Sequence, residues 1–520
     1  MTGAIDISAL ERAILCLPQQ FKGPGGAVGV VECGKIVARQ AWGYANLATG
    51  LAMTTATRMP ICSITKQFTC AVLLDLIGDP HLLDARLADY LPHLEGHPPG
   101  VVDLCNMQSG LRDYWALTVL HGAHPEGVFP REAAKPLLAS ARTTHFEPGK
   151  SYSYSNGNFR ILADLLEEYA GRSLAELYVQ RIFDRAGMQT ALLTADTSTP
   201  LDGVLGYEGN DRVGFFPATN RIHWEGDAGI SASLDDMLAW EIYIDATRDD
   251  PDGLYRRLSE KQTFSDGKPA PYGYGLVHGH VGDLATTGHA GGLRGFRLQR
   301  FHVASRRLSV VVFFNHEASA NEAALTLLRA GLGIEDEPRQ AYPLDPDWNG
   351  SYLDQSNGLL LDIHASGEGV EARYATSPER LFPGPGGMLV SPSMTLARAG
   401  DTVRLERPRE NLVATANRVT GDSVQDLPGR YFSPDLAAFL HIDMAGTCLF
   451  GCFEGLHGRG PMHAIYPAGK DVFVLPCQRS MDAPAPGRWT IQVNRNDAGQ
   501  ICGLTVGCWL ARNIPYRKVD

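Results

Sequence analysis

A serine and a lysine lie three residues apart at the start of a strongly apolar segment. The stretch ICSITKQFTCAVLLDLIG contains Ser63 and Lys66, and apolar side chains fill most of its other positions up to Gly78. Apolar residues at spacings of three and four predict a helix that is buried on nearly every side. The spacing places Ser63 and Lys66 on one face of its first turn. A lysine whose pKa is lowered by burial near a helix N-terminus can accept the proton of a serine nucleophile.

Two polar residues with complementary chemistry precede a second predicted helix. In SYSYSNGNFRIL, Tyr154 and Asn156 lie directly before the apolar run that ends at Gly171. A phenol at this position can share proton transfer with Lys66, and a carboxamide can orient both the lysine and a substrate carbonyl. The pair is therefore a candidate for the same site.

A third segment combines a histidine with two glycines. In TTGHAGGLRGFRLQRF, His289 lies at the start of a probable strand and is followed closely by Gly291 and Gly292. Glycines remove side chains where a substrate backbone has to lie close to the protein. This segment is therefore a candidate for a strand that contacts the substrate.

Each of these three patterns is common when it is taken alone. Ser-x-x-Lys recurs at residues 265–268 in a polar loop, Tyr-x-Asn at residues 44–46 on a predicted strand, and His-x-Gly at residues 280–282 before a turn. A capping serine with a solvent-facing lysine, or a polar start of a helix, also explains the individual matches. The functional interpretation depends on the order of the three segments and on their context.

Composition and charge disfavour several classes of protein. The chain has 520 residues, 44% of them hydrophobic, and its net charge of −12 argues against nucleic acid or an anionic membrane as a partner. The N-terminus does not resemble a signal peptide, and no apolar stretch is long enough to span a membrane. The ten cysteines form no Cys-x-x-Cys pair, so no zinc, other metal or cofactor is predicted. We expect a reduced, cytoplasmic protein.

The elements that must position the candidate residues suggest two or three domains. Up to about residue 333, predicted strands lie at both ends and helices lie between them. A hairpin turns at Gly34, and one helix begins at a capping box formed by Ser233 and Asp236. The pattern predicts an α+β domain over residues 1–333, in which helices cover an antiparallel sheet.

The remainder of the chain has the pattern of all-β structure. After residue 335, a charged linker with prolines leads into short alternating runs that are broken by Gly, Asp, Asn and Pro. Gly-Ser-Tyr at residues 350–352 is matched by Gly-Arg-Tyr at residues 429–431. The repeat predicts two small antiparallel β-barrels or sandwiches, over residues 338–420 and 424–520, although a chance similarity of two strand pairs is the alternative.

Taken together, the three segments resemble the penicillin-recognising serine hydrolases, which include class C β-lactamases, D,D-carboxypeptidases, esterases and D-peptidases. That family has Ser-x-x-Lys on a helix, Tyr-x-Asn in a loop, and Lys-Thr-Gly or His-x-Gly on a strand, in the order found here. The similarity covers roughly residues 20–333 and includes the stretch NMQSGLRDYWAL. It implies a β-lactamase-like fold, an acyl-enzyme on Ser63, and an oxyanion site formed by the backbone N–H groups of Ser63 and Gly292.

The similarity narrows to the bacterial D-aminopeptidases, in which a histidine replaces the lysine of Lys-Thr-Gly and two β-rich domains follow. A mostly neutral His289 attracts a substrate carboxylate less than a lysine does, which weakens the β-lactamase and carboxypeptidase interpretations. The resemblance implies a homodimer that releases N-terminal D-residues, D-alanine or glycine, from peptides, amides and esters. It further implies that Lys66 and Tyr154 transfer protons, that Asn156 orients the acyl carbonyl, and that His289 supports the network.

An aminopeptidase also has to bind the ammonium group of its substrate. The resemblance implies that a loop at residues 477–487 reaches the active site and that its Asp482 binds this group through a shielded ion pair. An ordinary solvent-facing hairpin tip is the alternative for this loop. Two other functions stay open: a carboxylesterase or D,D-peptidase of the same fold, and a non-catalytic penicillin-binding module.

Overall fold

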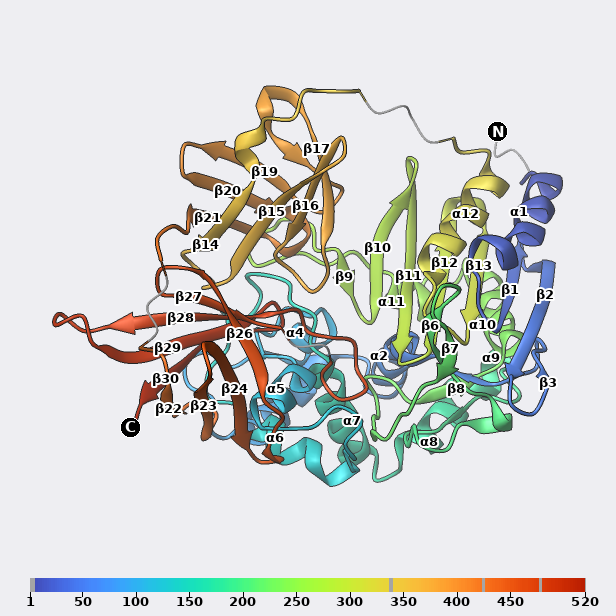
Figure 1. Cartoon of the computed structure of the whole chain (residues 1–520). Coiled ribbons are helices and arrows are strands. Elements are labelled where there is room, and N and C mark those ends of the chain that lie inside the picture. The colour runs from blue at the N-terminus through green and yellow to red at the C-terminus, as the bar shows by residue number, and fades with distance from the viewer. Residues whose placement is uncertain (1–4, 336–339, 423–425, 477–478, 520) are drawn as a thin grey trace.

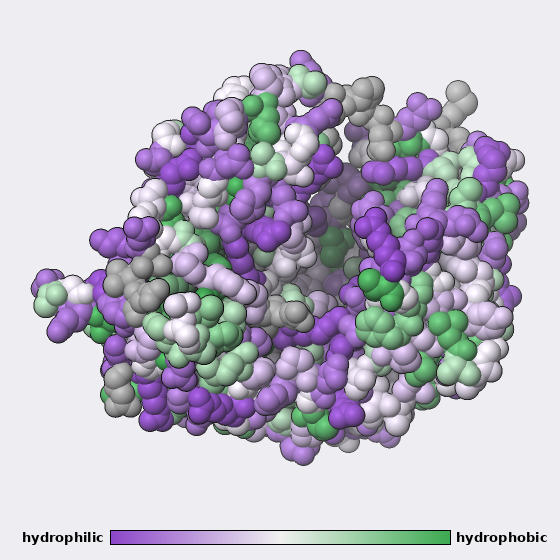
Figure 2. Space-filling view, in the orientation of Figure 1, coloured by the Kyte–Doolittle hydropathy of each residue, from purple (hydrophilic) through white to green (hydrophobic). Residues whose placement is uncertain are grey.

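The computed structural model describes residues 5–335, 340–422, 426–476 and 479–519. Figure 1 shows a large sheet flanked by helices on one side of the molecule and two β-barrels on the other. Figure 2 shows a deep hollow between these two halves on the face in view. The candidate residues of the first half therefore have to be located relative to the elements that border this hollow.

An eight-stranded antiparallel sheet forms the centre of the first half. Its strand order is β3-β2-β1-β13-β12-β11-β10-β9, so strands from both ends of this part of the chain pair with each other. The strands are β1 (Gly25–Glu32), β2 (Lys35–Asn46), β3 (Leu51–Ala52), β9 (Tyr272–Gly273), β10 (Leu276–Val281), β11 (Leu284–Leu293), β12 (Phe296–Val303) and β13 (Leu308–Phe314).

Helices bury both faces of this sheet. Successive side chains of the central strands therefore belong alternately to two cores. Val310 and Val312 of β13 belong to the core beneath α1 and α12, whereas Val311 and Phe313 belong to the core that includes α2, α7 and α10. The architecture is α+β, as the sequence predicts. The helices are α1 (Ile7–Gln20), α2 (Thr65–Leu76), α7 (Asn156–Ala170), α10 (Leu234–Ala246) and α12 (Ala320–Leu332).

Local signals in the sequence place several of these elements correctly. The β1–β2 turn passes through Gly34 with a φ of +74°, and α7 ends at Gly171 with a φ of +62°, a backbone region that glycine adopts without strain. Ser233 and Asp236 form the predicted capping box at the start of α10, with N–H to side-chain distances of 2.9 and 3.0 Å.

The second half of the chain forms two antiparallel barrels. The first is a closed barrel of eight strands, from β14 (Gly350–Asp354) to β21 (Leu412–Arg418). In the second, strands from β22 (Gly429–Ser433) to β30 (Ala511–Lys518) form a nine-stranded sheet, and pairing of β23 (Ala438–Ala445) with β24 (Cys448–Gly455) closes it into a ring. The two copies of the repeated tripeptide begin the first strand of each barrel.

The predicted domain limits at residues 338 and 424 lie outside the described residues, and the limits remain predictions. Within the described ranges, no helix is long and apolar enough to cross a membrane. Free thiols in those ranges are found at Cys16, Cys33, Cys62, Cys70, Cys105, Cys448, Cys452 and Cys502.

Candidate active site

A residue with left-handed backbone presents Ser63 at the start of α2. The chain leaves the short strand β4 (Met59–Pro60) and turns at Cys62, whose φ of 51° is unusual for a residue with a side chain. Cys62 and Ile64 are completely buried, so their packing offsets the cost of this turn. Ser63 lies between them in a 3₁₀ turn and is partly exposed, whereas Lys66 lies in the first turn of the helix.

Lys66 is fully buried, and its amine lies among three oxygen atoms. The Nζ atom is 3.1 Å from Ser63 Oγ, 2.8 Å from Asn156 Oδ1 and 2.6 Å from the backbone oxygen of Asp227. Burial lowers the pKa of Lys66 to about 8, because the charged form loses hydration, and the nearby Asp227 and Asp113 oppose this change only in part. A substantial fraction of Lys66 is therefore neutral at weakly alkaline pH.

The partners of Lys66 determine where the lone pair of the neutral amine points. The carbonyl oxygens of Asn156 and Asp227 can only accept hydrogen bonds, so they take the two N–H groups of a neutral lysine. The lone pair is then left for the hydroxyl of Ser63. This arrangement allows Lys66 to remove the proton from Ser63.

Tyr154 completes a hydrogen-bonded cluster with Ser63 and Lys66. Its hydroxyl is 2.9 Å from Ser63 Oγ, and its ring centre is 4.9 Å from the Nζ atom of Lys66. Burial raises the pKa of Tyr154 well above its ordinary value, so the phenol keeps its proton at neutral pH. Tyr154 can therefore donate to Ser63 while Ser63 donates to a neutral Lys66.

Two buried aspartates that our sequence interpretation did not select hold this cluster in place. Asp113 Oδ1 accepts hydrogen bonds from the backbone N–H and the Nδ2 of Asn156, at 2.6 and 3.1 Å, which turns the amide oxygen of Asn156 toward Lys66. Asp227 Oδ2 accepts from the Tyr114 hydroxyl at 3.0 Å. Burial raises the pKa of Asp113 to about 6 and also raises that of Asp227. The available signal was an acidic residue within the family-like stretches SGLRDYW and GDAGIS.

Strand β11 packs against the turn that carries Ser63. A Cβ atom at Gly291 would lie 2.5 Å from the backbone oxygen of Ile61, so this close approach requires glycine. The position of a Cβ on Gly292 is more open, with its nearest neighbours 3.8 and 3.9 Å away. This packing brings the strand that contains Gly292 beside the nucleophile, as an oxyanion site with two N–H donors requires.

His289 lies beside the cluster and bonds to other groups. Its Nδ1 atom is 2.6 Å from the backbone oxygen of Ala290, so Nδ1 carries the proton, and Nε2 accepts from the Tyr272 hydroxyl at 3.0 Å. Burial, together with the charge of Lys66, lowers the pKa of His289 to about 3, which keeps the ring neutral. The ring centres of His289 and Tyr154 are 6.1 Å apart. The uncharged ring of His289 therefore packs beside the cluster and forms no hydrogen bond to Ser63 or Lys66 among those of the described residues.

The loop between β27 (Val472–Leu475) and β28 (Trp489–Arg495) carries Asp482 into the interior. Asp482 is completely buried, and its Oδ2 atom accepts a hydrogen bond from the backbone N–H of Arg221 at 2.5 Å. Its Oδ1 atom is also buried and has no hydrogen-bond partner among the described residues. Burial raises the pKa of Asp482 to about 6. The burial of this carboxylate rules out a fully solvent-facing hairpin tip.

The same loop is anchored on the β-lactamase-like half of the molecule. Arg479 forms ion pairs with Glu208 and Glu317. A Cβ atom on Gly292 would lie 3.9 Å from Pro484 Cγ, so the loop reaches the strand beside Ser63. Residues 477 and 478, where the predicted loop begins, lie outside the described residues.

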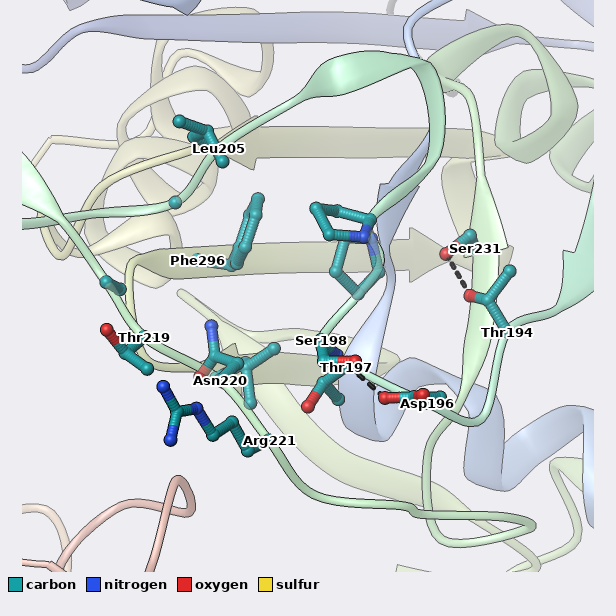
Figure 3. Close-up of a pocket in the computed structure, with 15 residues that line it drawn as sticks. Thr194, Asp196, Thr197, Ser198, Leu205, Thr219, Asn220, Arg221, Ser231 and Phe296 are labelled. Atoms are coloured by element: carbon teal, nitrogen blue, oxygen red, sulfur yellow. Dashed lines mark hydrogen bonds between the residues drawn. The ribbon is translucent and has the colours of Figure 1, made fainter. Parts of the chain in front are cut away.

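A polar pocket of about 280 Å³ adjoins the segment that binds Asp482 (Figure 3). Asn220 and Arg221 border one side, Pro60 precedes the nucleophile turn, and Leu293 follows Gly292. The amide oxygen of Asn220 is buried without a partner among the described residues. The hydroxyl groups that line the pocket come from Thr194, Thr197, Ser198, Thr219 and Ser231. The pocket thus provides polar space next to the site.

Comparisons with known proteins cover nearly the whole chain. The family described as beta-lactamase matches residues 10–333, and the family described as D-aminopeptidase, domain B, matches residues 342–517. A D-aminopeptidase from Brucella melitensis is 53% identical over 516 residues, which cover 99% of each chain. A D-aminopeptidase from Brucella anthropi has the same identity and coverage.

Solved structures share the fold at lower identity. An octameric penicillin-binding protein homologue from Pyrococcus abyssi is 20% identical with a TM-score of 0.56, and the match covers 79% of this chain and 100% of that one. A D-amino acid amidase from Ochrobactrum anthropi is 18% identical with a TM-score of 0.52, over 62% of this chain and 98% of that one. The family matches and the full-length identity together show that this chain belongs to the D-aminopeptidase family, with a beta-lactamase-like part followed by two β-barrels.

Proposed function

We propose that this protein is a serine aminopeptidase that releases N-terminal D-amino acids from small peptides, amides and esters. One observation supports this function best: a serine with a buried lysine base lies close to a loop whose carboxylate has a buried oxygen with no hydrogen-bond partner in the described ranges. The serine and lysine provide acyl-transfer chemistry, and the carboxylate provides a counter-charge for a substrate ammonium group.

In the first half of the reaction, neutral Lys66 takes the hydroxyl proton of Ser63 as the Oγ atom attacks the substrate carbonyl. The backbone N–H groups of Ser63 and Gly292 stabilise the oxyanion, and each such donor contributes about 3 kcal/mol. Asn156 orients the acyl carbonyl. The proton passes from Lys66 through the hydroxyl of Tyr154 to the departing nitrogen, the C–N bond breaks, and an ester remains on Ser63.

In the second half, a water molecule attacks this ester. Lys66, which is neutral again, takes a proton from the water as its oxygen bonds to the acyl carbon. The C–O bond to Ser63 then breaks, the proton returns to the serine Oγ, and the free D-amino acid leaves. Lys66 therefore carries a proton in both halves of the reaction.

Asp482 selects substrates that have a free amine. With a pKa of about 6 it is ionised at neutral pH, although its Oδ1 atom is buried and none of the residues that the structure describes bonds to it. A substrate ammonium group supplies a charge-assisted hydrogen bond to this oxygen, which offsets the cost of burying the charge. A substrate with a blocked amine cannot supply this hydrogen bond, so the cost of burying the charge is not offset.

Selectivity for D-residues follows from holding three points of the substrate. The acyl carbon is held at Ser63, its oxygen at the N–H of Gly292, and the amine at Asp482. Exchanging the hydrogen and the side chain at Cα then turns the side chain of an L-residue toward a different wall. Pro484 beside Gly292 narrows the site, which favours D-alanine or glycine.

We further propose that the enzyme is a cytoplasmic homodimer. Free thiols at eight of the described cysteines, among them Cys16, Cys33 and Cys502 at exposed positions, favour a reducing compartment. The dimer follows from the resemblance to the D-aminopeptidases, and sedimentation of the purified protein tests it.

Replacing the nucleophile tests the proposed function most directly. Ser63→Ala should abolish release of nitroaniline from D-alanyl p-nitroanilide, because no acyl-enzyme can form. Ser265→Ala, in the second Ser-x-x-Lys pattern, is the matched control and should keep the wild-type rate. The wild type should hydrolyse the L-alanyl anilide far more slowly. Wild-type turnover by Ser63→Ala, or equal rates on the two enantiomers, would contradict the proposal.

A further inference from the structure

A second pocket lies at the end of β11 that is remote from Gly292. Ala285, Thr286 and Thr287 of β11 contribute to its lining, and the end of α10 and the short helix α11 (Leu254–Leu258) border it. Its volume is about 330 Å³, within the range of small-molecule sites. The active-site residues occupy the last part of the same strand, so the two sites are separate.

The lining of this pocket carries cationic and imidazole side chains and no acidic residue. It includes Arg248, Arg256, Lys261, His278, His280 and His302. This is opposite in sign to the chain as a whole, whose net charge is −12. The positive charge comes from Arg248, Arg256 and Lys261, because burial lowers the pKa of His278 and lowers that of His302 to about 4. Positive charge in a hollow attracts an anion and disfavours cations.

Two of these cations have no ion-pair partner among the described residues. Arg248 forms ion pairs with Asp249 at 2.7 Å and with Asp245 at 3.7 Å, which offset its charge. Arg256 and Lys261 are exposed and form no ion pair with any residue that the structure describes. They are therefore free to bind an anionic ligand.

The wall of the pocket also offers an unused hydrogen-bonding atom. On the neighbouring strands His302, Thr287 and His278 lie side by side. Thr287 Oγ1 is 2.7 Å from the Tyr255 hydroxyl, and His302 Nδ1 is 2.9 Å from Ser309 Oγ. The Nε2 atom of His278, in contrast, is buried without a partner among the described residues. A ligand that enters the pocket can satisfy it.

Apolar surface forms a further part of the lining, which separates this site from a simple phosphate site. Ile244, Tyr255, Ala285 and Ala304 contribute to it. A small inorganic anion would leave this surface exposed to water, whereas an organic body would cover it.

We propose that this pocket binds a small organic carboxylate with an aryl or alkyl body. The carboxylate lies between Arg256 and Lys261, neither of which has an ion-pair partner in the described part of the chain. One of its oxygens accepts a hydrogen bond from His278. The body packs against Ile244 and Tyr255. This proposal is independent of the proposed aminopeptidase function.

Calorimetric titration of the full chain with 4-phenylbutyrate and with its neutral analogue 4-phenylbutan-1-ol tests the site. The carboxylate should bind saturably to one site, at least about tenfold more tightly than the alcohol. An excess of inorganic phosphate should weaken this binding only slightly. Absence of saturable binding, equal affinity for the alcohol, or full displacement by equimolar phosphate would overturn the proposal.

Variants locate the binding. Arg256→Ala/Lys261→Ala should weaken 4-phenylbutyrate at least about tenfold, and Ala304→Trp should weaken it by filling the pocket. Arg12→Ala/Lys470→Ala, which removes the same charge from exposed positions elsewhere, should bind like the wild type. All three should keep their nitroanilide turnover, which shows that they are folded. Unchanged binding by both pocket variants, or an equal loss in the control variant, would refute this location.

Discussion

The Ser63–Lys66 cluster and the Asp482 loop are both buried, but burial acts on them in opposite directions. It lowers the pKa of Lys66 to about 8 and raises that of Asp482 to about 6, because the charged form is disfavoured in each case. Lys66 has three oxygen partners, whereas one oxygen of Asp482 has none among the described residues. The first environment forms a base that is complete without substrate. The second leaves a charge that a ligand has to satisfy.

The two regions also come from different parts of the chain. The cluster lies within the beta-lactamase-like part, whereas Asp482 belongs to a loop of the second barrel. Changes in the two regions should therefore have separable effects. Substitutions in the cluster should reduce turnover of every substrate. Substitutions in the loop should reduce turnover mainly of substrates with a free amine.

The largest effect should come from removing the base. Lys66→Ala should lower kcat by about 10³-fold on D-alanyl p-nitroanilide and on a D-alanyl ester alike, because Tyr154, which also contacts Ser63 Oγ, keeps its own proton. Lys268→Ala removes the lysine of the second Ser-x-x-Lys pattern, which pairs with Asp266 on the surface, and should leave kcat unchanged. Steady-state kinetics measure both. A loss confined to one substrate would show that Lys66 acts in binding.

Asp482→Asn should lower kcat/KM for D-alanyl p-nitroanilide by about 10²-fold, since removing one partner of a buried ion pair costs roughly 3 kcal/mol. The rate on an N-acetyl-D-alanyl ester should stay within a factor of about two, because that substrate has no ammonium group to lose. Asp497→Asn, at an exposed position, is the control. Equal losses on both substrates would remove Asp482 from amine binding.

The same variant should be more stable than the wild type. The raised pKa means that folded Asp482 holds its proton more tightly than the unfolded chain does, so the wild type loses stability as pH rises from about 4 to about 6. At pH 7 the neutral asparagine should therefore increase the free energy of unfolding by about 3 kcal/mol, as judged by urea denaturation. Lower stability would show that the carboxylate is held for structure.

The pH dependence of kcat/KM should report both groups. Activity should rise as Asp482 ionises near pH 6 and again as Lys66 loses its proton near pH 8. It should fall above about pH 8, where the substrate amine becomes neutral. In Asp482→Asn the step near pH 6 should disappear and the step near pH 8 should remain. Persistence of the lower step would assign it to another group, such as Asp113.

The smallest effect should come from His289→Gln. The ring is neutral, and both of its nitrogens bond to Tyr272 and Ala290, so glutamine should change kcat by less than about tenfold. A decrease in kcat as large as that of Lys66→Ala would show that His289 takes part directly in proton transfer.

Much of the fold could be predicted from short-range patterns. Gly34, Gly171 and the Ser233–Asp236 box each specify a turn or a helix end through contacts within a few residues. The repeated Gly-x-Tyr tripeptide indicated two related barrels. Such signals can be recognised in the sequence because backbone geometry and helix capping depend on residues that are close along the chain.

The candidate site was predictable only in its residue types. The order of the sequence patterns pointed to Ser63, Lys66, Tyr154 and Asn156. The structure brings these residues into one hydrogen-bonded cluster. The only signal for Asp113, which orients Asn156, was its place in the family-like stretch SGLRDYW, because a single acidic residue has many possible partners.

By itself, the sequence determined which chemical groups are available and which local elements carry them. The tertiary structure decided their environment: the lone pair of Lys66 directed at Ser63, the neutral state of His289, and the burial of Asp482 with one oxygen bonded to Arg221. The physical reason is that protonation and hydrogen bonding depend on burial and on partners far away in the chain. Residues 221 and 482 meet only after the sheet and the second barrel have folded against each other.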